Sequence, residues 1–228
     1  MSTVSLSALR RANLPPIPAP VYEACWNLLG LGVMPFPLVV LGHSEQGRER
    51  TGSWLGEHGL GNGTRVGPEL AGALRVIADF DVELALVFAD ETGQTRVGCF
   101  VRGAEGLCAV LRGDEVRLTW IDPARLAESA LAAVPERAAA LVPEPRAAAE
   151  DDRAPGEFFD VYSTATAFGR ATSLSRCGDR IGTRVSEVPV TWLDTPDGRY
   201  SITTADGQLT LTPAGPAALL AQLRGLLG

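Results

Sequence analysis

The chain has 228 residues, 46% of them hydrophobic, which is enough for one large α/β domain or two small ones. Its 20 basic and 27 acidic residues give a net charge of −7, and every basic residue is arginine. This acidic balance excludes a general binder of nucleic acid or of anionic membranes, because such proteins need basic surfaces. No signal peptide and no apolar run of about 18 residues is present, so we expect a cytoplasmic protein without membrane insertion.

Hydrophobic periodicity predicts the elements of the first half of the chain. Expected are a short strand at residues 4–9, helices at 21–31, 46–58 and 68–78, and an extended apolar strand at 36–41. Four prolines between Pro15 and Pro20 exclude regular structure before the first helix. A meander of four strands follows at residues 82–88, 95–102, 107–112 and 115–121, joined by Gly- and Asp-containing turns. Asp122 and Pro123 then begin a helix that runs to about Ala133.

The second half begins with a segment rich in Ala, Pro, Glu and Asp at residues 134–157, which predicts a frayed helix and then a mobile linker. A helix is expected at residues 158–168, and the polar stretch 169–182 carries no clear pattern. Strands are expected at 187–193, 199–204 and 208–212, followed by a last helix at 216–227.

A weak internal repeat relates residues 116–133 to residues 207–223, each a strand, a proline and an amphipathic helix. If the repeat is real, the chain is one domain of two quasi-equivalent halves that share an antiparallel sheet. The halves would be about 1–137 and 156–228, joined by the Ala/Pro/Glu-rich linker 138–155.

The segment VTWLDTPDGRY, residues 190–200, is a well-specified β-hairpin. Trp192 lies at the end of one strand, and Arg199 and Tyr200 begin the next. Between them, Asp194-Thr195-Pro196-Asp197-Gly198 has turn chemistry: the proline fixes φ, the aspartates can accept from nearby backbone N–H groups, and Gly198 can take φ > 0.

This hairpin, V-x-W-x-D-T-x-x-G-R-Y, resembles the signature of the EspG family of type VII (ESX) secretion chaperones. A second block at the other end of the chain is similar to the opening pattern of that family. It comprises a helix with Trp26, a Gly-rich exit, Pro35-Phe36-Pro37-Leu38, the charged run Arg48-Glu49-Arg50, and a helix that ends in Gly59-Leu60. The resemblance gives these motif residues a structural role: Trp26, Arg48, Glu49, Arg50, Trp192, Asp194, Thr195, Gly198, Arg199 and Tyr200.

The resemblance implies an α+β fold, a quasi-two-fold central antiparallel β-sheet with flanking helices. It also implies a cytosolic chaperone from an actinobacterium, without enzymatic activity or cofactor, that grips the apolar tip of a helical PE/PPE-type heterodimer. Covering such a tip keeps an aggregation-prone surface out of water. A WXG-type or other helical-hairpin secretion substrate is an alternative client.

In the family, contacts to the client come from the sheet, from the loop between its second and third strands, and from helices of the second half. The loop maps here to Asp90, Glu91, Thr92 and Gln94. The helical region maps to residues 158–168, where Phe158, Phe159 and Tyr162 are predicted as exposed anchors, with packing in the core as the alternative.

Two other functions remain as alternatives. Gly42-His43-Ser44 imitates the nucleophile turn of α/β-hydrolases, with Ser44 as nucleophile, but Gln46 occupies the position of the closing glycine. A homo-oligomeric structural or binding protein, such as a homodimer, would instead bury an apolar surface against itself.

Metal and disulfide chemistry have little support. His43 and His58 lack metal-ligand spacing, so no metal site is expected. The four cysteines (Cys25, Cys99, Cys108 and Cys177) have no paired short spacing and are expected to be reduced, although Cys99 and Cys108 can approach across a hairpin.

Overall fold

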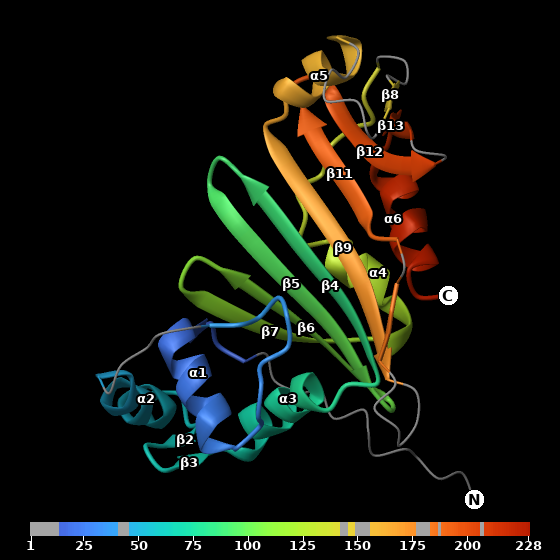
Figure 1. Ribbon diagram of the computed structural model, residues 1–228. Helices are drawn as coiled ribbons and strands as arrows, with labels where there is room; N and C mark the ends of the chain where they lie inside the picture. Colours follow the sequence, from blue (N-terminus) through green and yellow to red (C-terminus); the bar gives the residue numbers. More distant parts are fainter. Residues whose placement is uncertain are drawn as a thin grey trace, which may run out of the picture.

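The computed structural model describes residues 14–40, 46–141, 146–148, 156–176, 183–186, 188–205 and 208–228 (Figure 1). The predicted strand at residues 4–9 lies outside them. The helices are α1 (Ala19–Leu28), α2 (Gln46–Glu57), α3 (Pro68–Ala78), the 3-10 helix η2 (Pro123–Arg125), α4 (Leu126–Leu131), α5 (Gly156–Ser163) and α6 (Pro216–Gly225). The strands are β1 (Ile17–Pro18), β2 (Gly61–Asn62), β3 (Arg65–Val66), β4 (Val82–Asp90), β5 (Gly93–Arg102), β6 (Glu105–Arg112), β7 (Glu115–Ile121), β8 (Arg146–Ala148), β9 (Ala167–Arg176), β10 (Thr183–Val185), β11 (Val190–Thr195), β12 (Gly198–Ala205) and β13 (Gln208–Pro213).

One large antiparallel sheet organises the molecule, which confirms the expected α+β class. Its strands run in the order β1-β7-β6-β5-β4-β9-β11-β12-β13-β8, and β10 pairs with β9 beside this path. The long strands β4 and β9 pair at its centre along their whole lengths, from Val82↔Ser175 to Asp90↔Ala167. Each strand of this central pair begins a meander, β4 to β7 on one side and β9, β11, β12 and β13 on the other.

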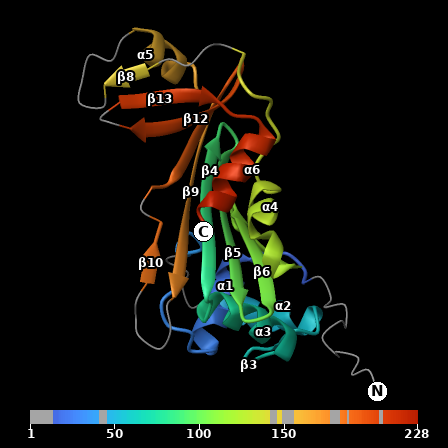
Figure 2. The ribbon, with the colours of Figure 1, turned by 90° about the vertical axis from the view of Figure 1, so that its right-hand side faces the viewer.

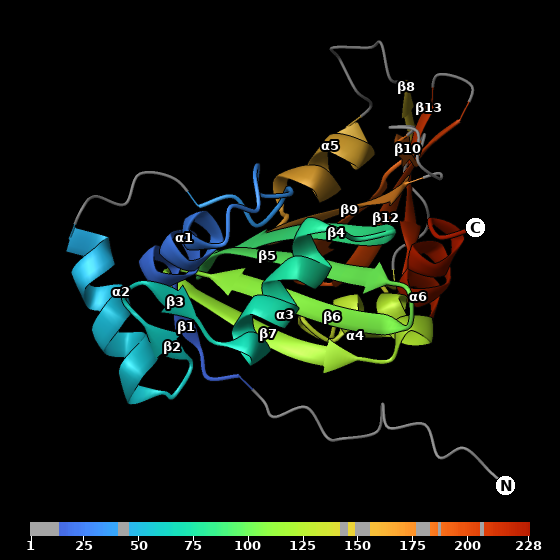
Figure 3. The ribbon, with the colours of Figure 1, turned by 90° about the horizontal axis from the view of Figure 1, so that it is seen from below.

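The sheet has two faces, which we name by the helices that cover them. On the α4 face, α4 and α6 lie side by side (Figure 2) and cover Leu84, Leu86 and Phe88 of β4 together with Trp192 of β11. On the α3 face, α1 and α3 cover β5 to β7 at one end of the sheet (Figure 3) and bury Phe100 and Leu118, among others. A smaller cluster near α5 buries Phe158 against Leu193, Tyr200 and Leu211.

The two sides of the sheet end alike. Strand β7 leads through η2 into α4, and β13 leads into α6. These are the segments that the sequence repeat relates, and their helices pack against each other. The division of the chain into two halves stays a prediction.

Strand β9 is the main element that the sequence did not predict. The expected helix at residues 158–168 ends at Ser163, and the patternless stretch after it forms the central strand of the sheet. Small buried residues alternate with exposed residues along β9, so neither face carries the row of large apolar side chains by which a strand is recognised in a sequence. Glycine is required at position 169, because a Cβ there would lie only 2.0 Å from the ring of Trp192.

Two expectations near the N-terminus were wrong. The prolines do not exclude regular structure, because β1 pairs Ile17 with Val116 at the edge of the sheet and α1 begins at Ala19. Pro20 stands in the first turn of α1, where no backbone N–H is needed. The segment 36–40 has turn and irregular backbone instead of a strand.

The segment predicted as a linker is partly ordered against the sheet. Ala139 forms a parallel bridge with Arg199, and β8 (Arg146–Ala148) pairs with β13. The turn chemistry of the meander was sufficient to place β4 to β7 within two residues of their observed ends.

Candidate partner-binding site

The middle of the α3 face lies between two groups of helices. Helices α1 to α3 gather at one end and α5 lies at the other (Figure 1), and a groove of about 460 Å³ lies between them over β4, β9 and β11. Its lining is Phe36, Ala85, Val87, Ala89, Phe168, Gly169, Arg170, Thr172 and Thr191. Because side chains alternate along a strand, Ala85, Val87 and Ala89 face this groove while Leu84, Leu86 and Phe88 fill the core behind them.

Exposed aromatic side chains stand along the groove. Phe36 comes from the loop after α1 and is 64% exposed. The loop is held in place by the buried Leu38 and by Arg96, whose Nη1 donates to the Val39 carbonyl at 3.1 Å. At the α5 end, Phe168 of β9 lies 5.4 Å from Tyr162 of α5, measured between ring centroids. Large exposed apolar groups around a concave sheet surface are typical of a protein-binding site.

The three predicted anchors separate into one core residue and two surface residues. Phe158 is buried at 6% exposure, so its prediction as an exposed anchor was wrong: α5 turns it toward Leu193 and Tyr200. Phe159 and Tyr162 are exposed, at 61% and 43%. Whether they contact a partner stays a prediction.

The predicted loop residues form the tip of the β4–β5 hairpin at one end of the groove. Asp90 Oδ1 accepts from the backbone N–H of Thr92 at 2.8 Å and from its hydroxyl at 2.5 Å. These hydrogen bonds hold the pKa of Asp90 below its ordinary value. Glu91, Thr92 and Gln94 are exposed, and a second cavity of about 490 Å³ lies beside Thr92 and Gln94. The hairpin is therefore a preformed, accessible loop.

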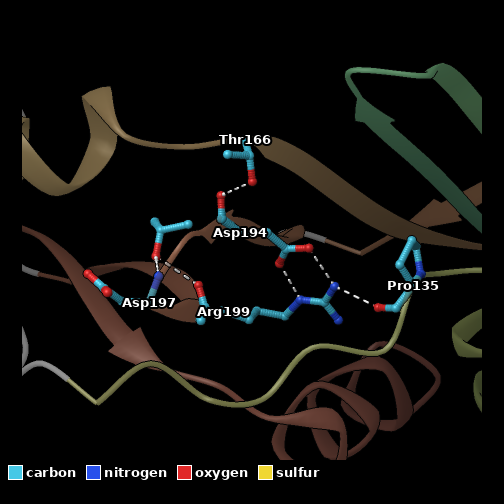
Figure 4. Close-up of polar contacts among 7 residues, drawn as sticks. Pro135, Thr166, Asp194, Asp197 and Arg199 are labelled. Atoms are coloured by element: carbon cyan, nitrogen blue, oxygen red, sulfur yellow. Dashed lines mark hydrogen bonds and ion pairs between the residues drawn. The ribbon is translucent and has the colours of Figure 1, made fainter.

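The residues of the C-terminal motif build a buried hairpin instead of a binding surface (Figure 4). Arg199 forms a two-point ion pair with Asp194, with Nε to Oδ1 at 2.6 Å and Nη2 to Oδ2 at 2.8 Å, and both side chains are about 1–2% exposed. Nη2 of Arg199 also donates to the Pro135 carbonyl at 3.0 Å. The Thr195 hydroxyl accepts from the backbone N–H of Asp197 and donates to the Gly198 carbonyl.

The same hairpin holds the segment that follows α4. The backbone N–H of Arg199 donates to Ala138 O, and Ala140 N–H donates to Arg199 O. Gly198 has φ +134°, and a Cβ there would lie 2.7 Å from Cα and N of Ala140, so only glycine fits. Tyr200 packs in the core beside Phe158. These contacts give the motif a role in joining 135–140 to the second side of the sheet.

The residues of the N-terminal block lie in α1 and α2. Trp26 is buried in α1 and its Nε1 donates to the Gly32 carbonyl at 2.8 Å, which closes the Gly-rich exit of the helix. Arg48, Glu49 and Arg50 all lie in α2. The side chain of Arg50 is exposed, and those of Arg48 and Glu49 are outside the described residues.

The residues considered for catalysis, metal binding and disulfide formation lie only partly within the part of the chain that the structure describes. His43, Ser44 and Cys177 lie outside it. His58 stacks on Trp54 at 4.4 Å, and its Nδ1 lies 2.8 Å from the Trp54 carbonyl. Cys99 and Cys108 are free thiols directly opposite each other on β5 and β6. Across the described ranges, no three His, Cys, Asp or Glu side chains gather as metal ligands would.

None of the helices in the described part of the chain combines the length and the apolar composition that crossing a bilayer requires.

The fold and the groove define an α+β protein with a one-sided surface suited to another protein. Residues 19–225 match the EspG family, so the chain belongs to this family, as the two sequence blocks predicted. Among solved structures, the type VII secretion system chaperone EspG5 of Mycobacterium tuberculosis, in complex with a PE25-PPE41 dimer, has a similar fold. The TM-score is 0.73 at 13% identity, over 93% of this chain and 95% of the matched one. No curated protein sequence matches the chain.

The groove residues were not predicted from the sequence. The signal that could have found them is the alternation of Phe168, Arg170 and Thr172 with Ala167, Gly169 and Ala171. It marks a strand with one face packed closely and the other face accessible.

Proposed function

We propose that this chain is a cytosolic chaperone of a type VII secretion system that binds a helical PE/PPE-type heterodimer and keeps it soluble before export. The observation that carries the proposal is the open apolar groove over β4 and β9, in a member of the EspG family. The likeness in fold to EspG5, which was solved with a PE25-PPE41 dimer, supports it.

The groove suits the tip of a helical hairpin. Its floor of Ala85, Val87 and Ala89 allows close approach, and Phe36 and Phe168 provide apolar contact area at its sides. In this proposal the β4–β5 hairpin, on which Glu91 and Gln94 are exposed, contacts the client beside the groove. Such a surface has the apolar centre and polar edge of a protein interface. It uses binding alone, without catalysis or cofactor.

The test is co-expression of the tagged chain with each PE–PPE pair encoded by the same genome, followed by size-exclusion chromatography with light scattering. We expect a complex of one chaperone, one PE and one PPE chain for at least one pair, and a client that aggregates without the chaperone. Recovery of no pair, or a self-dimer of the chaperone instead, would contradict the proposal.

A pair of variants connects the function to the groove. Val87→Arg places a long cation on the floor of the groove and should abolish the complex. Thr203→Arg adds the same side chain at an exposed position of β12 and should leave the complex intact. Equal binding by both variants would place the client elsewhere on the molecule.

A further inference from the structure

Arg170 is the one charged residue in the lining of the groove. It lies at the middle of β9, directly opposite Val87 of β4 and Thr191 of β11. Its side chain is exposed, and in the described part of the chain no hydrogen bond or ion pair involves it. The rest of the lining offers no carboxylate that could balance its charge.

Two other arginines of this sheet have structural roles, and the guanidinium group of each donates to acceptors within the protein. Arg96 lies in the same cross-strand row, on the other side of Val87, and donates to Gln94 Oε1 at 2.7 Å and to the Val39 carbonyl. Arg199 is buried in its two-point pair with Asp194. Arg170 differs from both, since its donors face the groove without an acceptor.

Hydroxyl groups extend this donor surface. Thr191 is the direct cross-strand neighbour of Arg170, and Thr172 stands two residues along the same face of β9. Both line the groove, and no hydrogen bond involves either side chain within the described residues. One guanidinium group and two hydroxyl groups therefore lie next to one another on a groove floor that is otherwise apolar.

A client that covers this floor must also satisfy the charge. Removing a guanidinium from water without a partner is costly, because its hydration is lost and nothing replaces it. The planar fork of Arg fits a carboxylate with two parallel hydrogen bonds, and a nearby hydroxyl can donate to a remaining lone pair. An acidic side chain on the bound tip is the partner with matching charge and geometry.

We propose that Arg170, with Thr172 and Thr191, recognises one Asp or Glu side chain on the apolar helical tip of the client. This inference rests on the proposed function and adds to it a criterion by which the chaperone distinguishes one client from another. A tip that is apolar throughout, or that carries Lys or Arg at this position, is rejected because Arg170 is then buried without a partner or against a like charge.

The test measures the Kd of the PE–PPE pair recovered with the wild-type chain, by titration calorimetry, for Arg170→Gln, Arg170→Lys and Arg170→Glu. Removing one member of a buried charge pair weakens binding by about 30-fold or more, so we expect this loss for Arg170→Gln. The Lys variant should retain part of the affinity, and the Glu variant should bind least. The matched control is Arg117→Gln, which removes the same charge from β7, where Arg117 pairs with Glu115.

The acidic residue of the client is then located by changing each Asp and Glu of the tip to its amide. One change should reproduce the loss of Arg170→Gln and add nothing to it in the double variant, and an Arg at that position should restore binding to Arg170→Glu. An Arg170→Gln chain that folds and binds within 2-fold of wild type, while Val87→Arg does not bind, would overturn this inference and leave the proposed function standing. A wild-type chain that recovers no pair would instead overturn the proposed function.

Discussion

The β11–β12 and β4–β5 hairpins have similar turn chemistry and opposite surroundings. Each closes its turn with a glycine at positive φ, Gly198 at +134° or Gly93 at +123°. In each, the residue opposite that glycine accepts from the backbone N–H two residues on: Thr195 accepts from Asp197, and Asp90 accepts from Thr92. In the first hairpin, chain passes directly over the turn, and Asp194, the residue before Thr195, is buried in an ion pair with Arg199. In the second, Asp90 binds only its own turn and the tip is exposed.

The difference shows that similar local sequences serve different purposes according to what covers them. The β11–β12 turn is part of the core and holds the segment after α4. The β4–β5 turn is held by hydrogen bonds from Thr92 to Asp90 and by one from Arg112 of β6 to the Thr92 hydroxyl, and Glu91 and Gln94 at its tip are exposed. The substitutions below test this contrast.

The largest loss of stability is expected for Arg199→Met, which leaves the buried carboxylate of Asp194 without its partner. Breaking a buried pair from one side costs about 3–5 kcal/mol. Urea unfolding followed by tryptophan fluorescence measures this loss, and one of the four tryptophans, Trp192, lies with its ring 5.9 Å from the guanidinium carbon. The double variant Asp194→Leu/Arg199→Met should regain much of the stability, because no charge stays buried. A double variant as unstable as the single one would show that the hydrogen bond to Pro135 matters more than the charge balance.

Alanine at the two turn glycines gives a direct comparison of the hairpins. At Gly198 the new Cβ would lie 2.7 Å from the backbone of Ala140, whereas at Gly93 nothing lies within 4 Å. Both variants bear the strain of positive φ, about 1–2 kcal/mol, and Gly198→Ala should lose about 2 kcal/mol more through displacement of the segment above it. Thermal unfolding of the two proteins side by side measures the difference. Equal losses would mean that residues 138–140 move away without cost.

A second buried carboxylate, Glu83 of β4, sharpens the contrast with Asp194. It is 3% exposed, its Oε1 has no hydrogen-bond partner in the described structure, and burial raises its pKa from 4.5 to about 8 despite the charge of Arg176. Between these two pH values the folded protein keeps a proton that the unfolded chain releases, so stability falls as the pH rises through this window.

Glu83→Gln should remove this dependence on pH. We expect the variant to match the wild type near pH 4 and to be more stable by up to about 5 kcal/mol at pH 9, since each pKa unit between 4.5 and about 8 corresponds to about 1.4 kcal/mol. Urea titrations at several pH values measure it. The control is Glu91→Gln, which makes the same substitution at an exposed position of the β4–β5 turn. A variant with the wild-type slope would mean that Glu83 is ionised in the folded protein.

The smallest effect on stability is expected at the exposed hairpin. Asp90→Ala removes the acceptor of two hydrogen bonds from Thr92, and surface changes of this kind usually alter stability by about 0.5 kcal/mol or less. Its effect should instead be on the client, as a few-fold rise in Kd, because the loop loses its fixed shape. Titration of the recovered PE–PPE pair measures this. An unchanged Kd would remove the loop from the interface.

Particular elements show where prediction from sequence succeeded. The meander β4 to β7 was predicted because apolar strands alternate with Asp- and Gly-containing turns, and α3 because its apolar residues recur on one face after a proline. The C-terminal hairpin followed from its turn residues alone. The family, too, followed from two sequence blocks, and the match over residues 19–225 confirmed it.

The sequence by itself determined the elements whose patterns are local: periodic helices, tight turns and the family motif. Only the tertiary structure decided that β9 is the central strand, that Asp194 and Arg199 are buried while Asp90 is only half-buried, and that Arg170 lies in a groove. The reason is physical. Turn and helix preferences depend on neighbours a few residues away, whereas burial and the pairing of charges depend on which distant segments pack above a residue, and for β9 those segments are β4 and β11.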